Sequence, residues 1–118
     1  MADSLIRQKS YAFSIRIVNM YKYLTETKRE FTLSKQVLRS GTAIGASICE
    51  AEYAESDADY IHKFKISLKE ASETRYWISL LKDTHYIDQQ MFDSILPDCE
   101  ELLRMLTAAI VTLRNKKK

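Results

Sequence analysis

Apolar residues recur at helical spacing along most of the chain, in four segments that short polar stretches separate. The first segment predicts a helix from about Ser4 to Thr27. Its core stripe is Ile6, Phe13, Ile17, Met20 and Leu24. A second apolar stripe, on another side of this helix, predicts contact with another subunit or partner; it consists of Tyr11, Ile15 and Val18. The alternative is a set of scattered surface apolar residues, which folded proteins commonly carry.

The second segment has helical periodicity but very little side-chain bulk. Thr32 or Ser34 can cap a helix that extends to about Ala54. Its core stripe is Val37, Gly41, Ile44 and Ile48. The chain's two glycines, Gly41 and Gly45, lie in this segment. Their spacing predicts that another helix packs closely against this one within a soluble bundle.

A narrower face of the same helix carries Arg39 and Glu50. The two residues are about 16 Å apart along a helix axis, so they cannot pair with each other. If they are buried, their partners must come from another helix or another chain; the alternative is that both face water. We predict that they belong to a subunit interface, together with a mixed apolar and acidic face of the next segment, formed by Ile66, Glu70, Glu73 and Trp77.

Two further caps define the remaining helices. Ser56 is the predicted N-cap of a helix that extends to about Lys82, and Asp88 is that of a helix extending to about Arg114. The core stripe of the first is Ile61, Phe64, Leu68, Ala71 and Ile78. That of the second is Phe92, Ile95, Cys99, Leu102, Leu103, Leu106, Ile110 and Leu113. Pro97 lies on the outer side of the last helix and is expected to kink it or to mark its start.

Four long helices with short loops predict one all-α domain over residues 1–118, an antiparallel up-down-up-down four-helix bundle. The low number of turn residues supports this, because a β-rich chain needs more than two glycines and one proline. The longest uncharged run, Ser40 to Cys49, is too short and too polar to span a bilayer, so no membrane partner is expected. Because no signal-peptide pattern is present, we expect a cytoplasmic protein, in which Cys49 and Cys99 are buried apolar groups rather than disulfide or metal ligands.

No residue pattern supports catalysis, and we assign no catalytic residue, metal ligand or cofactor. A di-iron bundle needs paired Glu-x-x-His motifs, whereas the nearest match here, Asp59-x-x-His62, has no second copy. Sequence shows no nucleophile beside a base. The segment around Gly41 and Gly45 lacks the lysine of a phosphate-binding loop. The protein is therefore not expected to be an enzyme.

Charge is unevenly distributed although the net value is only +2. Basic residues predominate in residues 1–49 and 102–118, and acidic residues predominate in 50–101. In an up-and-down bundle the two termini lie at one end, which predicts a nucleic-acid-binding patch of Arg7, Lys9, Arg16, Arg114, Lys116, Lys117 and Lys118. Equally, the acidic residues 50–59 lie at that end. In a ring, the basic patch of one subunit would then face the acidic loop of the next and serve assembly instead.

Three runs of residues carry a family resemblance. The first is Leu38-Arg39-Ser40-Gly41-Thr42-Ala43-Ile44-Gly45-Ala46-Ser47-Ile48-Cys49-Glu50-Ala51. The second is Ser56-x-x-Asp59-Tyr60-Ile61-x-Lys63 with Ile66-Ser67-Leu68-Lys69-Glu70-Ala71-Ser72-Glu73-Thr74-Arg75-Tyr76-Trp77, and the third is Glu101-Leu102-Leu103-Arg104-Met105-Leu106. Over about residues 5–114 the chain resembles the four-helix bundle proteins associated with 23S rRNA intervening sequences. It departs from their commonest pattern at Ser47, where Asn is usual, and at Ala51, where many members have Gly.

The resemblance implies a left-handed bundle and a ring-shaped homo-oligomer, with a pentamer favoured. The accessory protein of diversity-generating retroelements looks like a relative; it is a basic pentamer that works with a reverse transcriptase and nucleic acid. The near-neutral charge of this chain makes strong nucleic-acid binding less expected than for that relative. Our hypothesis is a non-enzymatic, ring-forming adaptor that binds RNA or a nucleoprotein partner. The alternative is a purely protein-binding oligomeric scaffold without nucleic-acid affinity.

Overall fold

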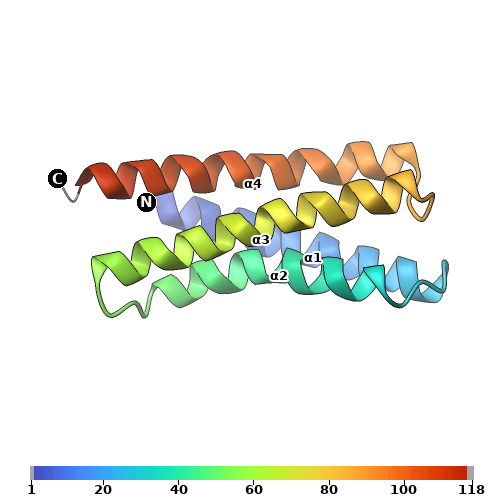
Figure 1. The fold of residues 1–118 in the computed structure, drawn as a ribbon, viewed down its shortest axis with the longest axis horizontal. Helices are drawn as coiled ribbons and strands as arrows, with labels where there is room; N and C mark the ends of the chain where they lie inside the picture. The colour runs from blue at the N-terminus through green and yellow to red at the C-terminus, as the bar shows by residue number, and fades with distance from the viewer. Residues whose placement is uncertain (1, 117–118) are drawn as a thin grey trace.

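The computed structural model describes the backbone of residues 2–116 and the side chains of residues 5–116. This range contains four α-helices and no strand: α1 (Ala2–Glu26), α2 (Leu33–Ala51), α3 (Asp57–Asp83) and α4 (Gln89–Lys116). They lie side by side in an elongated bundle that measures 49 × 22 × 19 Å (Figure 1). The predicted all-α four-helix bundle is confirmed.

Contacts between neighbouring helices, in which later residues of one helix meet earlier residues of the other, show that each pair runs antiparallel. On α2 and α3, Ser67 donates to the carbonyl of Ile44 at 2.8 Å, and Thr74, further along α3, donates to the earlier Ser40 at 2.9 Å. The termini and the α2–α3 connection therefore lie at one end of the bundle (Figure 1). Each helix packs against two others, and the α1–α4 contact is the least extensive of the four. The left-handed twist stays a prediction.

The predicted core stripes occupy the interior. On α1 and α2, every core position named from the sequence is buried. On α3 and α4 most are buried, and four lie half-buried against the core: Leu68, Phe92, Leu103 and Leu113. The helical period of apolar residues therefore identified the inward faces correctly.

The two glycines of α2 allow α1 to approach closely. A Cβ atom on Gly41 would lie 2.8 Å from Cγ1 of Ile17, closer than side-chain atoms pack. A Cβ atom on Gly45 would lie 3.3 Å from the hydroxyl oxygen of Ser10. The predicted close packing of another helix against this segment is confirmed, and that helix is α1.

Two of the predicted helix caps are confirmed and one is wrong. The side chain of Ser56 accepts the backbone N–H of Asp59 at 3.1 Å, and that of Asp88 accepts the N–H of Met91 at 2.8 Å. Thr32 precedes α2 but makes no side-chain cap. Instead, the carboxylate of Glu30 accepts the backbone N–H of Ser34, in the first turn of α2, at 2.8 Å. Helix α2 also ends at residue 51, three residues earlier than predicted, because tighter backbone turns follow it.

The two cysteines differ in environment. Cys99 is buried, its thiol donates to the carbonyl of Ala71 at 3.4 Å, and burial raises its pKa to about 12. Cys49 is exposed, so the prediction that both are buried is wrong for this residue. It follows the buried Ile48 by one position, which turns its side chain away from the core. Pro97 is exposed and lies inside α4, so it does not mark the start of that helix.

Candidate interaction surfaces

The outer face of α1 carries exposed apolar side chains. Tyr11 is 70% exposed and Ile15 is 51% exposed, one helical turn apart on the side opposite the core. Val18, the third member of the predicted stripe, is half-buried. More than half of Tyr11 and of Ile15 therefore remains accessible on the surface of the bundle. Its role in a subunit interface stays a prediction.

The cations predicted to bind nucleic acid from α1 are paired with carboxylates of the same chain. Arg7 forms an ion pair with Glu52. The ammonium of Lys9 lies 3.1 Å from the Glu101 carboxylate on α4. A guanidinium nitrogen of Arg16 lies 2.7 Å from the carboxylate of Asp98, also on α4. A phosphate at any of these sites would have to displace an existing partner.

Arg16 also has a structural role beside Pro97. Its guanidinium donates to the carbonyl of Ser94 at 2.9 Å and to the hydroxyl of the same residue at 2.6 Å. Proline lacks the N–H that would bond to the carbonyl four residues earlier, that of residue 93. Arg16 therefore binds α4 next to its weakened turn and joins α1 to α4 along their seam.

Arg39 and Glu50 both find partners on α3 of their own chain. Arg39 donates to Glu70 at 3.3 Å and also pairs with Glu73, whose carboxylate accepts the indole N–H of Trp77 at 3.2 Å. The hydrogen bonds from Arg39 and then from the indole lower the pKa of Glu73 below its ordinary value of 4.5. Glu50 lies 3.1 Å from the ammonium of Lys63.

The partners of Arg39 and Glu50, which the sequence alone could not identify, therefore lie within the same bundle. The network does not seal this face, because the side chain of Arg39 remains 51% exposed. Ile66 and Trp77 on the same face are half-buried. The predicted interface residues of α2 and α3 thus share one accessible surface, and their use by a second subunit stays a prediction.

The end of the bundle that holds both termini carries mixed charge. Arg114 and Lys116 are exposed and form no ion pair with a carboxylate of residues 5–116. Lys117 and Lys118, also predicted to bind nucleic acid, lie outside the described residues. The acidic α2–α3 connection lies at the same end (Figure 1). This end therefore does not form a uniformly basic patch within the described range.

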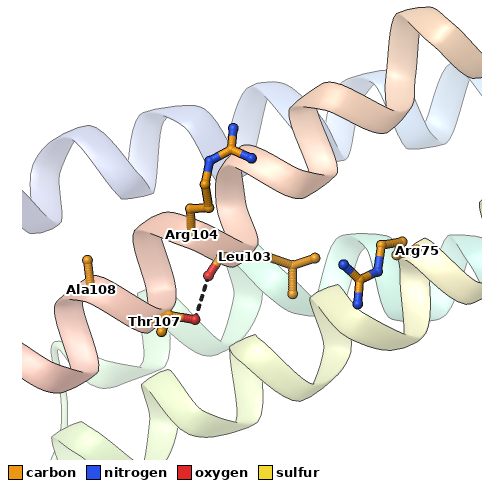
Figure 2. Close-up of a pocket in the computed structure, with 5 residues that line it drawn as sticks. All are labelled: Arg75, Leu103, Arg104, Thr107 and Ala108. Carbon is orange, nitrogen blue, oxygen red and sulfur yellow. Dashed lines mark hydrogen bonds between the residues drawn. The ribbon is translucent and has the colours of Figure 1, made fainter.

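The sequence did not single out a groove between α3 and α4, which Figure 2 shows. It is shallow and open to solvent, offers a volume of about 480 Å³, and is lined by Arg75, Leu103, Arg104, Thr107 and Ala108. Both arginines are exposed, and neither forms an ion pair with another described residue. Sequence patterns could not indicate this groove, because the two arginines are far apart in sequence and Arg75 belongs to a predominantly acidic stretch.

Other kinds of site find no support in the described part of the chain. No group of three or more His, Cys, Asp or Glu side chains there is arranged to hold a metal ion. Within the same residues, no helix combines the length and apolar character needed to cross a membrane.

Comparison with known proteins places the chain in a family. It matches the sequence model of the 23S rRNA-intervening sequence protein family over residues 2–108. No curated protein matches it. It is similar to the crystal structure of a protein with unknown function from the S23 ribosomal protein family of Bacteroides thetaiotaomicron, with 50% sequence identity and a TM-score of 0.91. The match covers 93% of this chain and 98% of that one. The chain belongs to the family of 23S rRNA-intervening sequence proteins.

Proposed function

We propose that this protein is a non-enzymatic adaptor that assembles into a ring-shaped homo-oligomer and binds RNA or a nucleoprotein partner. The observation that carries the proposal is the exposed stripe of Tyr11 and Ile15 on α1. The core of the bundle is already complete without these side chains. Exposed aromatic and branched aliphatic residues in adjacent turns are typical of a surface that another protein covers.

A ring requires two different surfaces on each subunit, because successive subunits meet head to tail. The α1 stripe supplies one of them. The face around Arg39 and Trp77 on α2 and α3 suits the other, because interface hot spots are rich in Trp and Arg. A pentamer is the assembly that we favour.

Two observations support binding of RNA or a nucleoprotein. Arg114 and Lys116 are exposed, without an ion pair to any described carboxylate. The family to which the chain belongs is named for an intervening sequence of 23S rRNA. A ring would also repeat every cation around its axis, so weak contacts would add through multivalency.

The second candidate is a scaffold that binds only protein. It is favoured by the ion pairs of Arg7, Lys9 and Arg16, since these neutralise cations that a nucleic-acid surface would need free. The two candidates share the assembly and differ in whether RNA binds at low salt.

Light scattering of the purified protein tests the assembly. We expect a mass several times that of one chain, and we expect Tyr11→Glu or Ile15→Glu to shift the protein to a folded monomer, because burying an unpaired charge is costly. Phe31→Glu is the matched control, since Phe31 is 49% exposed in the α1–α2 connection and lies outside the predicted interfaces. A wild-type monomer would overturn the proposed ring.

Filter binding to 23S rRNA fragments across a salt series tests the second half of the proposal. We expect binding at low salt that weakens as salt rises, because phosphate contacts release counterions. Absence of binding at low salt would contradict the proposed RNA binding and favour the protein-only scaffold.

A further inference from the structure

We propose that the groove between α3 and α4 binds single-stranded RNA, with Arg75 and Arg104 as its phosphate contacts. This inference rests on the proposed RNA binding and names the surface that carries it. It places the contact on α3 and α4, whereas the sequence alone predicted a patch formed by α1 and the C-terminus. The one-dimensional charge pattern does not show which cations already have partners.

The seven arginines of the chain fall into three groups according to their contacts. Three of them are in ion pairs with carboxylates of the same chain, namely Arg7, Arg16 and Arg39. Arg29 lies over the ring of Phe31, 5.3 Å from its centroid. The other three, Arg75, Arg104 and Arg114, have neither kind of contact among the described residues, and all lie on α3 or α4.

The groove combines these cations with an apolar floor. Figure 2 shows Leu103 directed from α4 toward α3, with Arg75 beyond it on α3. The hydroxyl of Thr107 donates to the carbonyl of Leu103 at 2.8 Å. This hydroxyl can therefore accept a hydrogen bond from a ligand but has no proton left to donate. A half-buried carboxylate, Glu100, lies one turn before Arg104 and forms no ion pair with a cation of residues 5–116.

The cationic surface continues along α4 beyond the groove. Arg114 follows Leu103 by eleven residues, which places it on nearly the same side of the helix and about 16 Å further along it. The groove is open to solvent along the bundle, so an extended strand fits it better than a compact ligand would. The row of Arg75, Arg104 and Arg114 therefore has the geometry of a track for a polyanion.

The chemistry of the groove and the proposed function together favour RNA as the occupant. Arginine binds phosphate with two parallel hydrogen bonds, and Arg75 and Arg104 have no carboxylate partner among the described residues. The family to which the chain belongs is named for an intervening sequence of 23S rRNA. Tyr76 follows Arg75 in sequence but does not line the groove, because its ring packs against Trp77 on the side of α3 that faces α2.

Fluorescence anisotropy with a labelled oligouridylate of about 16 nucleotides tests the proposal on the full-length protein. Arg75→Gln/Arg104→Gln removes two positive charges from the groove, and Arg7→Gln/Lys9→Gln removes two from α1. We expect the groove variant to bind about 25-fold more weakly at roughly 0.1 M salt, because two phosphate contacts with a salt slope of about 0.7 each are lost. We expect the α1 variant to bind within about twofold of wild type, because its cations already have partners.

The outcomes separate this inference from the proposed function. If wild type binds and the groove variant binds equally well, or if both double variants lose affinity equally, the groove assignment is wrong and RNA binding stands. If wild type does not bind at low salt, the proposed RNA function itself fails. If unlabelled polyglutamate competes as well as unlabelled RNA of equal charge, the groove takes an acidic protein instead. Circular dichroism and light scattering confirm that each variant keeps its fold and assembly.

Discussion

The α1–α4 seam and the α3–α4 groove both carry arginines, yet the two surfaces use them differently. On the seam, Arg16 is held by Asp98 and by the backbone and hydroxyl of Ser94. At the groove, Arg75 and Arg104 face solvent without a carboxylate partner among the described residues. A cation that stabilises the fold is not available to a ligand. The arginines on the two surfaces therefore have different roles, although the residue type is the same.

The packing of the helices explains the difference. Helices α1 and α4 make the least extensive contact in the bundle, so side-chain bridges supplement weak packing there. Helices α3 and α4 pack more extensively, and Cys99 contributes to that packing through its buried contact with Ala71. Arginines along this better-packed edge are not needed to join the two helices.

The largest expected effect comes from forcing α1 away from α2. Gly41→Val should destabilise the fold by about 3 kcal/mol, because even a single added carbon would lie 2.8 Å from Ile17 and the valine adds two more. Gly45→Ala is the control, since its added carbon would meet Ser10 at 3.3 Å and alanine favours the helix; we expect a change within about 1 kcal/mol. Urea unfolding measures both. Equal losses would show that α1 does not pack on α2 as described.

A smaller effect should distinguish a paired arginine from an unpaired one. Arg16→Ala should cost about 1 kcal/mol in the free energy of unfolding, because it removes the contacts with Ser94 and Asp98 at a partly exposed site. Arg104→Ala should change it by less than about 0.5 kcal/mol. Chemical denaturation of the two variants side by side checks the difference. Equal destabilisation would contradict the division of the arginines.

The smallest effect is a pH dependence at the Arg39 network. Because the folded pKa of Glu73 lies below its ordinary 4.5, this carboxylate stabilises the protein above that pH, and its contribution is lost as the pH falls through the lowered value. The contribution should be under about 1 kcal/mol, since Arg39 is half-exposed. Thermal melts from neutral to acid pH should show a shallower loss for Arg39→Ala than for wild type. Parallel curves would show that the pairing contributes nothing.

The fold could be predicted from the sequence because it depends on regularities that repeat along the chain. A helical stripe such as Ile6, Phe13 and Ile17 identifies a buried face directly. Caps such as Ser56 and Asp88 depend on residues only three positions away. The close approach of α1 also followed from local sequence, since glycine at Gly41 removes the side chain that would prevent it.

The surfaces could not be predicted to the same extent, because they depend on pairs of residues distant in sequence. Lys9 and Glu101 meet only once four helices are assembled, and no local pattern relates them. The same applies to Arg75 and Arg104, which line one groove from different helices. Glu30 caps the start of α2 in place of Thr32 because its longer side chain reaches forward to the backbone of the first turn.

Photo-crosslinking tests most directly whether RNA contacts the α3–α4 edge rather than α1. A single-stranded RNA that contains 4-thiouridine is irradiated with the full-length protein, and the modified residues are mapped by mass spectrometry. We predict crosslinks in the α3 segment around Arg75 and in the α4 segment around Arg104, which excess unlabelled RNA abolishes. Crosslinks confined to α1, at Tyr11 or beside Arg7, would contradict the assignment of the unpaired arginines to RNA.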